Sequence, residues 1–124
     1  MEQLTTLQQQ TQGRLIEVAM LMKKVEIRIS KEQLASLGRI MGTYLANLPL
    51  TDINDKAIFF LLYGIYESKV RKKQFSLKQQ MKVSLDLPQA WAMVAMMQEV
   101  DLAAWQYENS LKEMIIREID HQTA

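Results

Sequence analysis

Glu118 and His121 are the pair of residues in this chain whose spacing most resembles a catalytic or metal site. They stand three positions apart in the sequence EIDH, which is the spacing that helical di-iron bundles use to hold metal. Such a site also needs a second Glu-x-x-His pair, and His121 is the only histidine in the chain. The sequence therefore predicts no metal site and no cofactor.

The other common catalytic arrangements lack their components as well. Nucleophilic catalysis needs a serine or cysteine beside a base that a third group orients, and the chain has no cysteine and one histidine. No glycine-rich phosphate loop is present either. We expect a protein that is not an enzyme; two buried carboxylates facing one pocket would be needed to revive a catalytic hypothesis.

Composition indicates one soluble globular domain. The chain has 124 residues, of which 48% are hydrophobic and 23% charged, as in ordinary folded proteins. The net charge of +1 gives no overall attraction to nucleic acid or membranes. The longest apolar run, AIFFLLYGIY at residues 57–66, is shorter than the roughly 18 residues that cross a bilayer. Together with the absence of cysteine, these features predict a cytoplasmic protein without a membrane partner.

One local cluster of positive charge stands out against this neutral total. No acidic residue occurs between Glu67 and Asp86, and the interval contains several basic residues: Lys69, Arg71, Lys72, Lys73, Lys78 and Lys82. Arg71, Lys72 and Lys73 could contact phosphates, with Phe75 available to stack on a base. The basic last turn of a helix, where the helix dipole favours cations, explains these three residues without any ligand, and most such runs are of this kind.

The beginning of the chain predicts a loose segment followed by a strand and a capped helix. Residues 1–13 are rich in Gln and Thr, so we expect them to be loosely ordered, with a helix over about residues 14–23 and a single compact helical domain over 14–120. From Val25 to Ser30 apolar and polar residues alternate, as in a half-buried strand. Ser30 and Gln33 form a capping-box pattern, which begins a helix that Pro49 ends.

A second alternating segment resembles the first. Val83, Leu85 and their neighbours repeat the pattern of residues 24–29 at an offset of 58 positions, and Pro88 suits the first turn of a following helix. The apolar run over 57–66 predicts a central buried helix between the two strands. From Gln89 to Ile119 no glycine or proline interrupts the chain, which favours one long helix; a break near Asp101 is the alternative.

The expected fold is therefore mainly α, with four helices and a short two-stranded antiparallel ribbon in the order α-β-α-α-β-α. The strands could pair within one chain or between two. On the long last helix one apolar stripe faces the core, and a second group of apolar residues lies about 100° away around the axis. This second group, Trp91, Val94, Leu102 and Trp105, is our candidate surface for a protein partner or a second copy, with a homodimer expected.

KVEIRISKEQLASL, residues 24–37, resembles the start of a ribbon-helix-helix DNA-binding protein, and the resemblance extends over residues 24–73. In that family two strands from two copies pair and lay their outward side chains in the major groove. The resemblance implies that Lys24, Glu26, Arg28 and Ser30 would face DNA, with Arg28 reading a guanine edge. The second strand departs from the pattern, because an outward Asp86 would repel phosphate.

Two functions follow as expectations. The first is an interaction module that binds a protein partner or itself through the last helix. The alternative is a DNA-binding regulator, whose contacts would be Lys24, Arg28, Arg71, Lys72 and Lys73.

Overall fold

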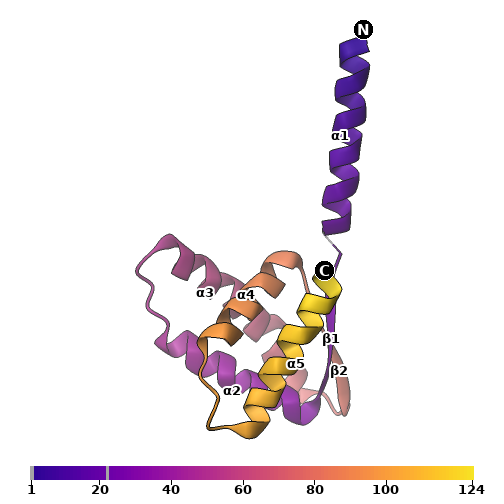
Figure 1. The fold of residues 1–124 in the computed structure, drawn as a ribbon. Helices are drawn as coiled ribbons and strands as arrows, with labels where there is room; N and C mark the ends of the chain where they lie inside the picture. The colour runs from indigo at the N-terminus through magenta and orange to yellow at the C-terminus, as the bar shows by residue number, and fades with distance from the viewer. Residues whose placement is uncertain (1, 22) are drawn as a thin grey trace.

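The computed structural model describes residues 2–21 and 23–124, with side chains described for residues 6–18 and 23–124, and it confirms a mainly α fold with a small ribbon (Figure 1). In order, the described elements are α1 (Glu2–Leu21), β1 (Val25–Ser30), α2 (Lys31–Asn47), α3 (Ile53–Ile65), the short helical turns η1 (Tyr66–Arg71) and η2 (Lys72–Phe75), β2 (Gln80–Leu85), α4 (Leu87–Glu99) and α5 (Gln106–Thr123).

The two strands pair with each other inside one chain. β1 and β2 are antiparallel, and Ile27 lies opposite Val83 at the middle of the register. Alternate residues on each strand are at most 8% exposed and face the helices: Val25, Ile27, Ile29, Met81, Val83 and Leu85. Because side chains alternate along a strand, the remaining residues form the outer face of the ribbon. Of the two alternatives that the sequence left open, the structure shows strands that pair within one chain.

Each strand runs directly into a capped helix. The Ser30 hydroxyl accepts the Gln33 backbone N–H at 3.1 Å, and the Gln33 side chain accepts the Ser30 N–H at 2.9 Å, as predicted. Asp86 and Gln89 form the same reciprocal pair at the start of α4, at 2.8 and 3.0 Å. Both pairs use side-chain oxygens to satisfy amides that a first helical turn leaves free.

The positions of the two caps show that the predicted offset between the two halves of the chain was wrong. Ser30 corresponds to Asp86 and Gln33 to Gln89, an offset of 56 and not the predicted 58. With this offset Ile27 corresponds to Val83, its own partner across the ribbon. The chain thus contains two units, each a strand followed by two helices, and an approximate two-fold axis through this central pair relates their strands and helix caps.

Side chains from the helices close both outer edges of the ribbon. On the β1 edge, the Gln122 amide of α5 accepts the Glu26 N–H at 2.8 Å and donates to the Glu26 carbonyl at 2.7 Å. On the β2 edge, the Lys69 ammonium donates to the Ser84 carbonyl and the Lys73 ammonium to the Lys82 carbonyl. An open edge would invite pairing with another chain, and these contacts occupy four of the backbone groups that such pairing would use: the N–H and carbonyl of Glu26 and the carbonyls of Ser84 and Lys82.

The last segment forms two helices, so the prediction of four helices was wrong and the break near Asp101 is the correct alternative. α4 ends at Glu99 and α5 begins at Gln106. Between them the Asp101 carboxylate accepts the Ala103 N–H at 3.2 Å, and the Trp105 N–H donates to the Leu102 carbonyl at 2.9 Å. A side chain that bonds its own backbone two residues onward competes with the helix, which explains a break without glycine or proline.

Two helices differ from their predicted extent or environment. α1 begins at Glu2, so the expected boundary at residue 13 falls within a helix. Its described side chains, from Thr6 to Val18, are all exposed, and the helix extends away from the body (Figure 1). α3 buries Leu62 and Ile65 but leaves Phe60 74% exposed, so it covers the core on one side and is not the enclosed central helix that its composition suggested.

The capping box gives a direct test of how the ribbon is joined to α2. We expect Ser30→Ala to lower the free energy of unfolding by about 1 kcal/mol, because it removes an N-cap acceptor. Ser110→Ala is the matched control: Ser110 is exposed within α5 and donates only to the Gln106 carbonyl. Urea unfolding measures both variants, and equal stability of Ser30→Ala and the native chain would contradict the role of the cap.

Candidate functional site

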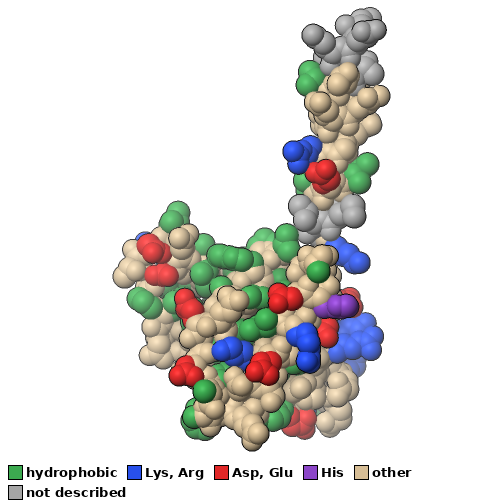
Figure 2. Space-filling view, viewed as in Figure 1, with side chains coloured by type: hydrophobic (Ala, Val, Ile, Leu, Met, Phe, Trp, Pro, Cys, Tyr) green, Lys and Arg blue, Asp and Glu red, His purple; other side chains and the backbone are tan. Residues whose placement is uncertain are grey.

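The outer face of the ribbon holds a basic cavity of about 720 Å³. Its walls are Arg28, Lys73, Ser76, Lys78, Gln80, Met81 and Lys82. Blue side chains gather on the side of the body that displays the ribbon (Figure 2). We call the four cations Arg28, Lys73, Lys78 and Lys82 the basic face.

The strand register brings two cations of the basic face, Arg28 and Lys82, together. Arg28 on β1 lies directly opposite Lys82 on β2. The Lys82 carbonyl points to the outer edge, where Lys73 binds it, so this is a non-hydrogen-bonded pair, the type with the closer side chains. Glu26 lies 3.7 Å from the Lys82 ammonium. Among the described residues, no carboxylate lies within ion-pair distance of Arg28, Lys73 or Lys78.

The structure groups only some of the residues that the sequence suggested for nucleic acid. Arg28 and Lys73 share the cavity wall. Lys24 is exposed just before β1, and its charge helps to lower the pKa of Lys69, although burial of Lys69 is the larger cause. Arg71 instead pairs with Glu67 at 3.1 Å within η1, and Lys72 is exposed on η2 outside the cavity wall.

Two members of the basic face were missed as site residues. Lys78 and Lys82 belong to the acid-free interval that the sequence revealed, but their closeness to Arg28 depends on the pairing of β1 with β2. Asp86, which seemed to oppose phosphate binding, follows the end of β2 and caps α4 by accepting the Gln89 N–H at 2.8 Å. Its carboxylate faces the positive end of a helix dipole.

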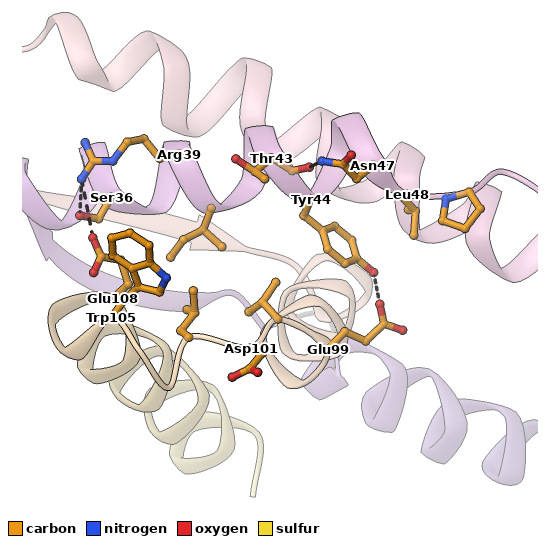
Figure 3. Close-up of a pocket in the computed structure, with 14 residues that line it drawn as sticks. Ser36, Arg39, Thr43, Tyr44, Asn47, Leu48, Glu99, Asp101, Trp105 and Glu108 are labelled. Carbon is orange, nitrogen blue, oxygen red and sulfur yellow. Dashed lines mark hydrogen bonds and ion pairs between the residues drawn. The ribbon is translucent and has the colours of Figure 1, made fainter.

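A second concave region lies between α2 and the turn that joins α4 to α5 (Figure 3). We call it the α2 groove; its volume is about 730 Å³. Apolar side chains from both walls line it: Ile40, Leu48, Pro49, Val100, Leu102 and Trp105. Trp105 is 63% exposed, so a large aromatic surface remains available at one end of the groove.

Polar residues hold the two walls of the α2 groove together. The Tyr44 hydroxyl donates to the Glu99 carboxylate at 2.5 Å, and the Arg39 guanidinium lies 3.0 Å from the Ser36 hydroxyl and 4.0 Å from the Glu108 carboxylate (Figure 3). Burial raises the pKa of the Tyr44 phenol, and the bond to Glu99 raises it further. The phenol therefore remains a hydrogen-bond donor at neutral pH.

The break after α4 separates the four residues proposed for a protein partner. Leu102 and Trp105 line the α2 groove. Trp91, 53% exposed, and the half-buried Val94 lie on α4 and are absent from the groove wall. α4 packs on α3, and hydrophobic side chains gather over these two helices in Figure 2. The expected continuous tryptophan surface is thus divided between two places.

Two further features concern metals and membranes. Within residues 6–18 and 23–124, whose side chains are described, no three His, Cys, Asp or Glu side chains are grouped as metal ligands would be. The Glu118 carboxylate accepts the Gln122 amide at 3.4 Å. Over residues 2–21 and 23–124, every helix is too short or too polar to cross a membrane.

No protein-family model, curated protein or solved structure matches the chain.

The contact between Tyr44 and Glu99 predicts a pH effect. A phenol whose pKa is raised on folding contributes stability that is complete below its unfolded pKa, about 10, and is lost as the pH rises through the folded value. We expect Tyr44 to ionise at higher pH than a free tyrosine, whose pKa is about 10, and Glu99→Gln to lower the pKa of Tyr44 by removing the carboxylate charge. The phenolate absorbance of the native chain minus that of Tyr44→Phe measures this pKa; a value no higher than that of free tyrosine would contradict the contact.

Proposed function

We propose that the chain binds duplex DNA through the basic face of its ribbon. The observation that supports this most is the placement of Arg28 directly opposite Lys82 on an exposed strand face, with Lys73 and Lys78 on the same cavity wall. Like charges opposite one another in a ribbon are destabilising. A bound phosphate backbone would remove that repulsion and release counterions, which makes the arrangement favourable in a complex.

The shape of the ribbon suits the major groove, which admits a two-stranded β-ribbon. Its inner face is fully used by the core, so only the outer side chains could contact a ligand. In our proposal Arg28 donates to a guanine edge, while Lys73, Lys78 and Lys82 contact phosphates. This is the contact mode that the resemblance to ribbon-helix-helix proteins implies, except that one chain supplies both strands here.

The proposal predicts the effect of removing single cations. Arg28→Ala and Lys82→Ala should each weaken duplex binding at least about fivefold. The dependence of affinity on salt should become shallower, by about one unit in the log–log slope for each phosphate-binding cation that is removed. Fluorescence anisotropy with a labelled duplex, measured over a series of salt concentrations, gives both quantities.

Lys56→Ala is the matched control for these variants. Lys56 is an exposed cation on α3, so its removal changes the net charge equally but lies outside the basic face. Its affinity for the duplex should stay near the native value. Undetectable binding by the native chain at low salt would end the proposal, and an equal weakening in all three variants would show that only net charge matters.

Protein binding is a second candidate function, and the α2 groove supports it. The groove residues include three acids, Glu99, Asp101 and Glu108, and one base, Arg39, which leaves a local charge of about −2 in a chain of net charge +1. We propose that the groove receives a positively charged segment of another protein. A bulky apolar side chain of that segment would pack on Leu102 and Trp105, because exposed aromatic residues in concave sites are typical binding anchors.

A displayed library of random linear peptides tests the groove. We expect enriched peptides to combine a bulky apolar residue with flanking Lys or Arg, and Trp105→Ala to abolish the enrichment. Trp91→Ala is the matched control, since it removes an indole of similar exposure outside the groove. Enrichment of acidic peptides, equal enrichment on both variants, or none on the native chain would refute this candidate.

A further inference from the structure

We propose that a single chain recognises a non-palindromic duplex and binds it in one fixed orientation. This inference rests on the proposed DNA binding and specifies its substrate. It follows from a contrast between the backbone of the ribbon, which is nearly two-fold symmetric, and the side chains that the ribbon presents, which are not.

The symmetric backbone is evident from the register and the caps. An offset of 56 relates Ser30 to Asp86 and makes Ile27 and Val83 equivalent partners. The edge contacts agree with this symmetry, because Glu26 and Lys82 are equivalent and a side chain binds the carbonyl of each. Gln122, which binds the Glu26 carbonyl, lies within α5, the second helix of its unit. Lys73, which binds the Lys82 carbonyl, follows α3, the second helix of the other unit. The two ends of the ribbon would therefore meet duplex DNA at similar distances.

The side chains at equivalent outer positions differ in charge. The carboxylate of Glu26 corresponds to the ammonium of Lys82, and the guanidinium of Arg28 corresponds to the hydroxyl of Ser84. Lys78 adds charge near the end of the ribbon where Ser30 meets Gln80, while Glu26 lies near the other end. One half of the ribbon thus offers a guanidinium fork where the other offers a hydroxyl.

These groups require different bases in the two halves of the site. A guanidinium fork donates two hydrogen bonds to the O6 and N7 atoms of guanine, and a serine hydroxyl has no such preference. A palindrome would present the same base to Arg28 and to Ser84, so one of its halves would be read poorly. The closed strand edges at Glu26 and Ser84 also oppose extension of the ribbon by a second copy.

Selection from a library of random duplexes provides the first test. The enriched sequence should be non-palindromic, and one chain should bind each duplex. Arg28→Ala should lower affinity for that sequence at least about fivefold and erase the base preference in one half only. Ser84→Ala, at the equivalent position, should keep affinity within about twofold.

Directed cleavage provides the second test, because the chain has no cysteine and one introduced thiol can be labelled uniquely. An iron chelate attached at Leu77→Cys, beside the Gln80 end of the ribbon, should cut one flank of the selected duplex. The same chelate at Lys23→Cys, before β1, should cut the other flank. Both residues are exposed and lie outside the basic face.

The outcomes separate this inference from the proposed function. A palindromic selected sequence, two chains per duplex, or cleavage of both flanks from one position would overturn the fixed orientation while leaving DNA binding intact. If no duplex is bound at low salt, both proposals fail.

Discussion

Pairing of β1 with β2 is the interaction on which the rest of this structure depends. A two-stranded ribbon is marginally stable in water unless something packs beneath it. Here its inner face, centred on Ile27 and Val83, joins one core with the helices, and both strands continue into capped helices. Gln122, Lys69 and Lys73 complete the ribbon by binding its outer carbonyls. The same pairing that organises the core also decides which side chains can face outward.

The clustering of positive charge on the basic face also depends on this pairing. A net charge of +1 predicts no affinity for polyanions, yet the ribbon concentrates Arg28, Lys82, Lys73 and Lys78 around one cavity. Of the three acids in the α2 groove, Glu99 ends α4, Asp101 lies in the turn between α4 and α5, and Glu108 lies in the first turn of α5. These two surfaces of opposite charge are the observations from which our two proposals, of DNA binding and of protein binding, are argued.

Local patterns predicted much of this fold, while contacts between distant residues were beyond them. Alternation identified β1, and the Ser30–Gln33 spacing identified the start of α2, because both signals lie within a few residues. A break near Asp101 was predicted only as the alternative to one long helix, because a side chain bonding its own backbone, and not glycine or proline, ends the helix. The contact of Gln122 with Glu26 joins residues 96 positions apart, and the meeting of Lys82 with Arg28 requires the register, which no local pattern specifies.

The central claim, that one chain supplies the whole ribbon, is tested most directly by a double variant, Glu26→Cys with Ser84→Cys. These residues face each other in a non-hydrogen-bonded pair, whose Cα atoms lie roughly 4.5 Å apart, a distance that a disulfide accepts. After mild oxidation, non-reducing electrophoresis and mass spectrometry should show a monomer whose mass is lower by two hydrogens. Covalent dimers joining Cys at one position to Cys at the other, without the internal bond, would contradict the account.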